Sequence, residues 1–130
     1  LVAIEANAMG STQGDEIEVE SYHRVLTDNK TSHPGCALTS AKGNIGHLGP
    51  ASGVASLIKA ALSLYHGALP PQPNHLQGIP ALQKPDMNFV VPTQKPMPWT
   101  GDGDSLMGVS GFAMGGTNVH ILLRQGLRVH

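Results

Sequence analysis

The chain has 130 residues, with eight basic and nine acidic side chains and a formal net charge of -1. This balance excludes the basic excess that nucleic-acid-binding and anionic-membrane-binding proteins carry. Only 13% of the residues are charged, which is low for a free-standing domain, so we expect further protein to cover part of the surface. The one cysteine, Cys36, excludes an internal disulfide framework and favours a reducing compartment, here expected to be the cytoplasm.

Two strands and one helix are predicted in the first forty residues. Leu1–Ala8 is short and apolar and predicts a strand; it begins without methionine or a basic leader, so we expect a piece of a longer polypeptide with no signal peptide. Asp15–Leu26 mixes apolar residues with acids at its beginning and an arginine near its end, which predicts an amphipathic helix. Thr27–Gly35 predicts a loop, and Cys36–Ser40 a second strand.

The most apolar segment of the chain follows a glycine-rich turn, Ala41–Gly53, that contains His47. Val54–Tyr65 predicts a helix whose polar side chains form one narrow stripe, made of Ser56, Lys59 and Ser63. A helix with so much apolar circumference is expected to be covered by protein on most sides, and this one is too short to span a bilayer.

Prolines dominate Gly67–Trp99, which holds most of the ten prolines of the chain and therefore predicts no long regular element. Within this segment Met87–Val91 predicts a short strand. Leu106–Phe112 and Asn118–Arg124 predict two further strands, and the tight Gly-Gly connection between them makes the pair antiparallel. The resulting order, βαβαββ, predicts a mixed sheet with right-handed crossovers.

Three turns combine glycine with polar side chains: Asn7–Thr12, Lys42–His47 and Gly111–His120. The first two follow predicted strands and precede predicted helices, so in a βαβ unit they share the end of the sheet where ligands usually bind. Backbone N–H groups there can hold a developing oxyanion, and His47 can donate a hydrogen bond or move a proton. His47 can equally be a helix cap or a satisfied core histidine, and its spacing leaves both interpretations open.

Other ligands fit these turns less well. Gly43, Gly46 and Gly49 follow G-x-x-G-x-x-G spacing, which is not the dinucleotide fingerprint, and no P-loop motif occurs. The seven histidines include no pair at i and i+4, and there is no Cys-x-x-Cys, so no metal site is predicted. His120 alternates with apolar neighbours and is interpreted as structural, and Cys36 lies away from any helix start and is interpreted as inert.

Together the three turns resemble the carboxyl-terminal half of a β-ketoacyl synthase, the condensing domain of fatty acid and polyketide synthases. The family's three motifs are Lys-x-Asn-x-Gly-His, Gly-Gly-Thr-Asn-x-His and Gly-Asp-x-x-Glu. They are matched, in that order, by Lys42–His47, by Gly115–His120, and by Gly14, Asp15 and Glu18. The resemblance runs from Leu1 to about Arg124 and is nearest to animal-type fatty acid synthase and related type I polyketide synthases.

The resemblance implies the thiolase fold, of which this chain would be one α/β half. Such a half has the order βαβαββ, a five-stranded mixed sheet and one buried central helix, within a five-layered body. The half-domain would span residues 1–125, and residues 126–130 would begin a linker or tail. The buried helix would then owe its second cover to the other half.

The resemblance also implies a reaction. A cysteine in the amino-terminal half would take an acyl chain as a thioester, and two histidines would assist decarboxylation of a malonyl unit. The carbanion would attack the thioester, backbone amides would stabilise the oxyanion, and a 3-oxoacyl thioester would result. The substrates would be carried on the phosphopantetheine of an acyl carrier protein, with no cofactor bound directly. The implied partners are the amino-terminal half, the carrier protein and a second copy of the full domain.

The implied catalytic residues are His47, with Lys42 in support, and Asn7, which occupies the place of the family's other catalytic histidine. The implied substrate and oxyanion loop residues are Met114, Gly115, Gly116 and Asn44. Taken without the resemblance, Lys42 is a solvated lysine and Met114 a core side chain.

Several positions depart from the family pattern. Asn7 can donate a hydrogen bond but cannot titrate near neutrality, and losing one charge-stabilising donor costs on the order of 10²–10³ in rate. Ala8 and Met9 crowd the same turn, and Met114 stands where an aromatic residue is usual. Two hypotheses follow: a condensing enzyme with altered residues, or a non-condensing scaffold or acyl-transfer domain. Under either, the fragment alone is expected to be inactive.

Overall fold

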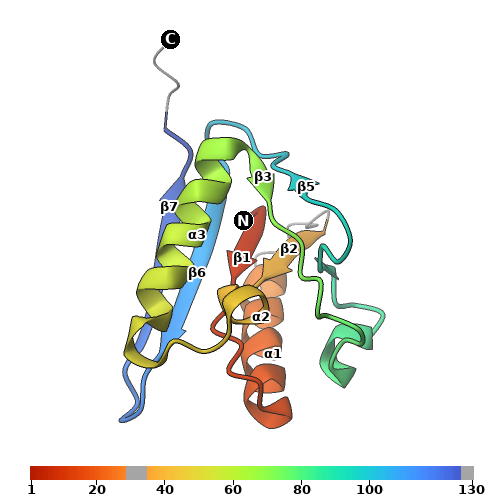
Figure 1. Ribbon diagram of the computed structural model, residues 1–130. Helices are drawn as coiled ribbons and strands as arrows, with labels where there is room; N and C mark the ends of the chain where they lie inside the picture. The colour runs from red at the N-terminus through yellow and green to blue at the C-terminus, as the bar shows by residue number, and fades with distance from the viewer. Residues whose placement is uncertain (29–34, 127–130) are drawn as a thin grey trace.

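The computed structural model describes residues 1–28 and 35–126 as one α/β unit (Figure 1). Five strands form its main sheet, in the order β4-β2-β1-β6-β7. Most of the predicted loop Thr27–Gly35 and most of the predicted tail 126–130 lie outside the described residues. Among the described helices, none combines the length and apolar character needed to cross a membrane.

The middle of the sheet is parallel. β1 (Ala3–Glu5) lies between β2 (Cys36–Thr39) and β6 (Leu106–Phe112) and pairs with both in parallel register. β4 (Phe89–Val90) extends the parallel part beyond β2. β7 (Asn118–Arg124) pairs antiparallel with β6, as their tight connection predicts. The predicted mixed five-stranded sheet is therefore confirmed, and with β4 counted its strands and two long helices follow the order βαβαβββ.

Two helices cover opposite faces of the sheet. Successive side chains of a strand point to opposite faces, so Ala3 and Ile4 enter two different cores. Ile4 packs in a cluster with Val19 of α1 (Thr12–Asp28). Ala3 packs in a second cluster with Ala60 and Leu64 of α3 (Ser52–His66). Both helices run one to three residues beyond their predicted limits at each end, because polar residues can continue a helix without belonging to its apolar period.

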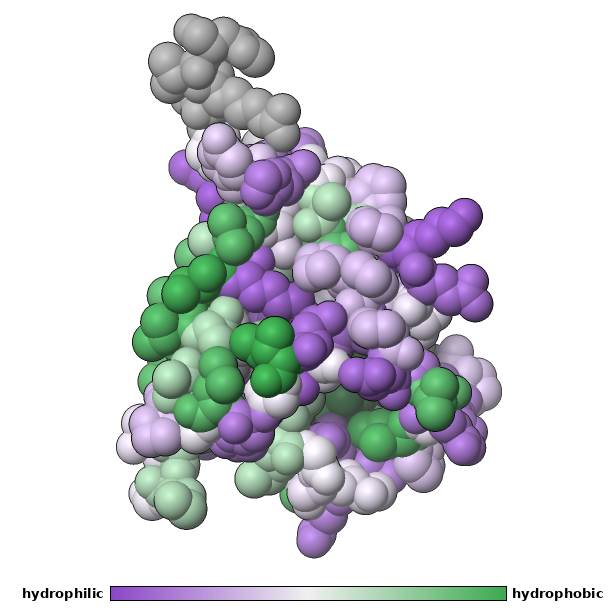
Figure 2. Space-filling view, in the orientation of Figure 1, coloured by the Kyte–Doolittle hydropathy of each residue, from purple (hydrophilic) through white to green (hydrophobic). Residues whose placement is uncertain are grey.

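On the long helix α3, small polar residues are buried and large apolar residues are exposed, which is the reverse of a surface helix. Its small polar residues Ser56 and Ser63 face the sheet and are 1% and 3% exposed. Its large apolar residues Ile58 and Leu62 point outward and are 54% and 52% exposed. The hydrophobic side chains gather on this flank of the molecule (Figure 2). The chain's own residues therefore cover only one side of the helix that we expected to be covered on most sides.

The prediction of an irregular turn over Ala41–Gly53 is wrong at its beginning. Residues Ala41–Ile45 form a short helix, α2, because Ser40 caps it by accepting a hydrogen bond from the Lys42 N–H at 3.3 Å. A 3₁₀ turn, η1 (Gly49–Ala51), then leads into α3.

The proline-rich segment contains short elements that composition does not reveal. β3 (Ala68–Leu69) pairs antiparallel with β5 (Met97–Pro98), and η2 (Pro80–Gln83) is a 3₁₀ turn that begins at a proline. None of these exceeds four residues, in agreement with the prediction that no long element survives there.

Candidate functional site

The three glycine-bearing turns meet at one edge of the sheet. β1, β2 and β6 are mutually parallel, so the segments that follow them leave from the same, carboxyl, edge. Asn7 follows β1, α2 follows β2, and the turn 113–117 follows β6. In Figure 1, α2 lies near the middle of the view and the turn between β6 and β7 lies at the lower left.

Glu18 of α1 supports the turn that begins at Asn7. Its two carboxylate oxygens accept the backbone N–H groups of Asn7 at 2.8 Å and Ala8 at 2.9 Å. This support matters because Ala8 has a φ of 40°, in the left-handed region that residues other than glycine rarely occupy. The match to the Gly-Asp-x-x-Glu motif thus has a structural role: its glutamate fixes a strained turn.

Glu18 is itself fixed by a polar group between the sheet and α1. The Tyr22 hydroxyl donates to Glu18 and lies 2.6 Å from the Ser110 Oγ, which is 2.8 Å from Nδ1 of His120. Burial, followed by the negative charge of Glu18, raises the pKa of Tyr22 well above its usual value. His120 therefore belongs to the support of the turn, consistent with its interpretation as structural.

Lys42 reaches across the edge to Asn7. Its amine donates to the Asn7 backbone oxygen at 2.6 Å and to the side-chain Oδ1 at 3.3 Å. The N–H of Phe112 also donates to Oδ1, at 3.3 Å. These two donors assign the amide orientation: its oxygen is engaged, and within the described residues no hydrogen bond uses its NH₂ group. Asn7 is 6% exposed, so little of the residue is in contact with solvent.

Lys42 is partly removed from water by these contacts. Burial lowers the pKa of its amine, and the carboxylates of Glu18 and Glu5 oppose that shift. Lys42 is therefore more than a solvated lysine, because its amine also donates to Asn7.

His47 lies on the exposed rim, two residues beyond α2. Its Nδ1 accepts the Gly49 N–H at 2.9 Å and lies 3.3 Å from the Ser52 Oγ. In the neutral ring this leaves the proton on Nε2, so His47 offers an Nε2–H donor. The structure does not make His47 a core histidine, which removes one of the two alternatives to a functional role.

The remaining predicted site residues are Asn44, which lies on α2, and the residues Met114, Gly115 and Gly116, which lie in the turn after β6. Asn44 uses both ends of its amide within the chain: it donates to the Pro71 oxygen at 2.8 Å and accepts from the Gln72 Nε2 at 2.9 Å. Met114 is fully exposed, so it does not pack in the core that this chain forms by itself. Gly115 and Gly116 both have positive φ, at 94° and 87°, and make the tight turn beside it. Substrate contacts by these four residues stay a prediction.

Two further residues, not predicted from the sequence, brace the site. Glu5 is fully buried and accepts from the Ala41 N–H at the beginning of α2 and from the Thr39 hydroxyl at 2.6 Å. Its Oε2 also lies 3.0 Å from the amine of Lys59 on α3. A glutamate inside an apolar strand is the sequence signal that was available, because a buried carboxylate needs partners.

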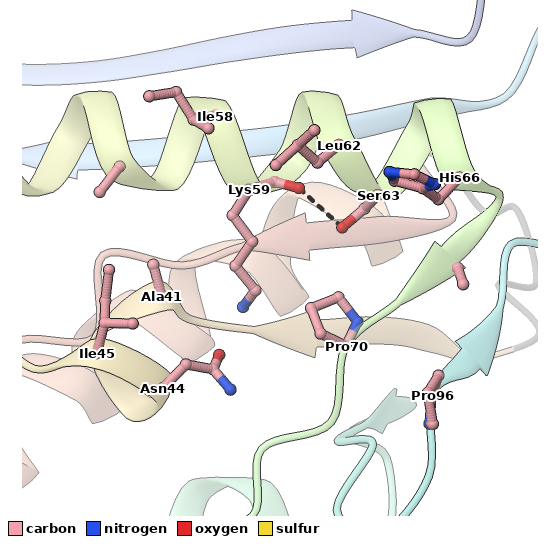
Figure 3. Close-up of a pocket in the computed structure, with 12 residues that line it drawn as sticks. Ala41, Asn44, Ile45, Ile58, Lys59, Leu62, Ser63, His66, Pro70 and Pro96 are labelled. Atoms are coloured by element: carbon pink, nitrogen blue, oxygen red, sulfur yellow. Dashed lines mark hydrogen bonds between the residues drawn. The ribbon is translucent and has the colours of Figure 1, made fainter.

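A hollow of about 650 Å³ lies beside α3, lined mainly by apolar side chains. The Lys59 amine reaches from α3 toward Ala41 and Asn44 of α2 (Figure 3). Burial lowers the pKa of that amine, although Glu5 opposes the shift.

Among the described residues no group of three or more His, Cys, Asp or Glu side chains could hold a metal ion. Cys36 is 1% exposed, and burial raises its pKa to about 11.

Comparison with known proteins identifies the family. Residues 2–75 match the family described as β-ketoacyl synthase, C-terminal domain. The chain belongs to the β-ketoacyl synthase family. The observed mixed sheet with its covering helices is consistent with the thiolase-like half of this family.

Relatives of this ketosynthase chain are large polyketide synthases. It is 40% identical over 126 residues to a component of the phenolphthiocerol/phthiocerol polyketide synthase of Mycobacterium tuberculosis, covering 95% of this chain and 8% of the relative. It is also 40% identical to the reducing polyketide synthase hmp8 of Hypomyces subiculosus, covering 92% of this chain and 5% of the relative. The chain thus spans less than a tenth of these curated relatives.

Solved ketosynthases share the fold. Ketosynthase twelve of the bacillaene polyketide synthase from Bacillus amyloliquefaciens superposes with a TM-score of 0.86 at 34% identity, covering 97% of this chain and 22% of the solved one. The module 6 ketosynthase of the bacillaene synthase from Bacillus subtilis gives 0.85 at 33% identity, covering 97% and 23%.

Proposed function

We propose that this chain is the carboxyl-terminal half of a ketosynthase domain that condenses acyl and malonyl units into 3-oxoacyl thioesters, in polyketide or fatty acid synthesis. The observation that carries the proposal is the fixed orientation of the Asn7 amide. Lys42 and the Phe112 N–H occupy its oxygen, so its NH₂ group is the part left to face a ligand. A donor held there can stabilise negative charge on a thioester oxygen.

The chemistry that these residues support begins with the malonyl unit. Its C–C bond to the carboxylate breaks, CO₂ leaves, and the electron pair is delocalised onto the thioester oxygen as an enolate. The NH₂ of Asn7 and the Nε2–H of His47 are the donors we assign to that oxygen. The enolate carbon then attacks an acyl thioester on a cysteine of the amino-terminal half, and the cysteine sulfur leaves as a thiolate. Lys42 holds Asn7 in place throughout.

The proposed partners follow from the exposed apolar face of α3 and from the greater length of the solved relatives. The outer face of α3, formed by Val54, Ile58, Leu62 and Tyr65, is apolar and exposed. The solved relatives contain several times more chain than this one, so we assign this face to the amino-terminal half. We further propose substrates carried on the phosphopantetheine of an acyl carrier protein, a homodimer of the full domain, and a cytoplasmic location. We propose that the half-domain spans residues 1–125, with a linker or tail beginning at 126.

The test reunites this chain with its own amino-terminal half and follows condensation by the mass of the carrier-bound product. Asn7→Asp keeps the oxygen that Lys42 binds but replaces the NH₂ donor with a second acceptor. We expect its rate to fall on the order of 10²–10³, the usual cost of losing such a donor. Asn7→His restores the family residue and is expected to keep activity. A wild-type domain that forms no 3-oxoacyl product would overturn the proposal.

A second function, acyl transfer without condensation, is favoured by one observation. Asn7 cannot take up a proton or carry positive charge, unlike the histidine it replaces. Under this hypothesis the domain would load and release an acyl chain whose mass is unchanged. The same assay separates the two functions: gain of condensation only in Asn7→His would support acyl transfer.

A further inference from the structure

The short helix α2 cannot hold its own place. It has five residues, and isolated helices of this length are not stable in water. It nevertheless carries Lys42, which holds Asn7 in place, and leads to His47, one of the two donors assigned above to the thioester oxygen. Its position must therefore be set by contacts with other segments. Glu5 provides one of these at its amino end, through the Ala41 N–H.

Gln72 provides the other contacts from within the proline-rich segment. It is 6% exposed, and its Oε1 accepts the Ser40 N–H at 3.3 Å. Its Nε2 donates to the Asn44 Oδ1 at 2.9 Å, so one side chain bonds to the residue before α2 and to a residue near its end. The Gln72 backbone N–H donates to the Pro92 oxygen at 2.6 Å, which fixes Gln72 itself.

The residues near Gln72 in the chain also form hydrogen bonds with α2. Asn44 donates to the Pro71 oxygen at 2.8 Å, and Asn74 donates to the Gly43 oxygen at 3.1 Å. Gly43 also fits Gln72 closely: a Cβ on Gly43 would lie 2.6 Å from the Gln72 Oε1. In Figure 3 the Asn44 amide points toward the chain that continues from Pro70. The absence of a side chain at Gly43 is therefore what lets this segment approach α2.

We propose that Gln72 is a positioning residue, which holds α2 and thereby sets the places of Lys42 and His47. This inference rests on the proposed function, because those places matter only in a site that binds a thioester. A displacement of about 1 Å in a catalytic group can cost on the order of 100-fold in rate. Gln72 touches neither substrate nor reacting atoms; it acts through the helix.

The experiment uses the full ketosynthase domain and the variant Gln72→Met, which keeps the size of the side chain and removes its hydrogen-bonding groups. The matched control is Gln77→Met in the same segment, where the glutamine is exposed. We expect kcat to fall roughly 10- to 100-fold in Gln72→Met, with KM for the malonyl carrier within about twofold. Backbone amides of residues 40–46 should exchange hydrogen faster, while the melting temperature stays near that of the control.

Gly43→Ala provides an independent variant of the same contact. Its added Cβ should push Gln72 away and lower kcat roughly tenfold or more. In the double variant Gly43→Ala/Gln72→Ala the obstructing side chain is absent. Its kcat should therefore equal that of Gln72→Ala alone, because both changes break one contact. Losses that multiply would contradict the inference.

The outcomes separate this inference from the proposed function. Unchanged kcat and unchanged exchange over residues 40–46 in Gln72→Met would overturn the inference, as would a loss of kcat that merely follows a loss of folded protein. If the wild-type domain does not condense, the proposed function fails by itself. The exchange measurement then still decides whether Gln72 holds α2: protection equal to that of Gln77→Met would overturn it.

Discussion

The helices α2 and α3 are neighbours in the chain but are held in place by opposite means. α2 has five residues, and side chains or backbone groups of Glu5, Ser40 and Gln72 bond to it. α3 has fifteen residues and is positioned by packing, with Ala60 and Leu64 in a core against the sheet. Hydrogen bonds are directional, so they fix the position and orientation of α2 closely. Apolar packing is not directional, and on α3 it covers only the face toward the sheet.

This difference assigns separate roles to the two helices. α2 carries Lys42 and ends just before His47, so the position of this helix affects the chemistry of the site. α3 exposes an apolar outer face, where we propose that the amino-terminal half packs, so we expect this face to affect folding of the whole domain. The Glu5–Lys59 ion pair, at 3.0 Å, joins the support of one helix to the other.

The largest effect is expected on the outer face of α3. Ile58→Asp with Leu62→Asp would place two charges where we propose the amino-terminal half packs. Each side chain contributes about 1.5–3 kcal/mol when buried, and a buried unpaired charge costs more. We expect the reunited domain to lose its folded form, measured by size-exclusion chromatography and thermal unfolding.

Leu76→Asp is the matched control for that face, because Leu76 is 95% exposed but lies in the proline-rich segment. It should leave the melting temperature nearly unchanged. A domain with both charges on α3 that melts like the Leu76→Asp control would show that the outer face of α3 stays free.

A smaller effect is expected at α2, on rate and not on folding. Lys42→Met keeps the length of the side chain but removes the amine that holds both oxygens of Asn7. With the amide released, we expect condensation to slow by about 100-fold, the cost of a misplaced group. Steady-state kinetics on the reunited domain measures this. Wild-type kcat in Lys42→Met would remove Lys42 from the site.

The smallest effect is expected at the helix caps. Ser40→Ala removes the side-chain cap of α2 and should lower the free energy of unfolding by about 0.5–2 kcal/mol. The opposite change, Ala51→Ser before α3, should have little effect, since Ala51 has helical backbone angles and α3 is held by its packing against the sheet. Denaturant unfolding compares the two. Equal effects would mean that α2 and α3 depend on their caps alike.

The sequence alone predicted much of the fold and of the site. The five strands of the main sheet, the two long helices and the antiparallel β6–β7 pair followed from hydrophobic periodicity and glycine turns, because these are local properties of the chain. The motif around Lys42 and His47 pointed to the correct family for the same reason. The resemblance also marked Asn7, Ala8, Met9 and Met114 as positions that depart from the family pattern.

Other features arose only when segments distant in the sequence came together. No local pattern predicts that Gln72, between two prolines, bonds to α2 some thirty residues earlier, or that the Asn7 oxygen is occupied by Lys42 and the Phe112 N–H. The hydrophobic period of α3 indicated a narrow polar stripe but not its direction. Ser56 and Ser63 are buried on the same side of the helix as Ala60 and Leu64, whereas the larger Ile58 and Leu62 remain exposed. Local sequence determined which elements form, and tertiary contacts decided which groups they leave free to act.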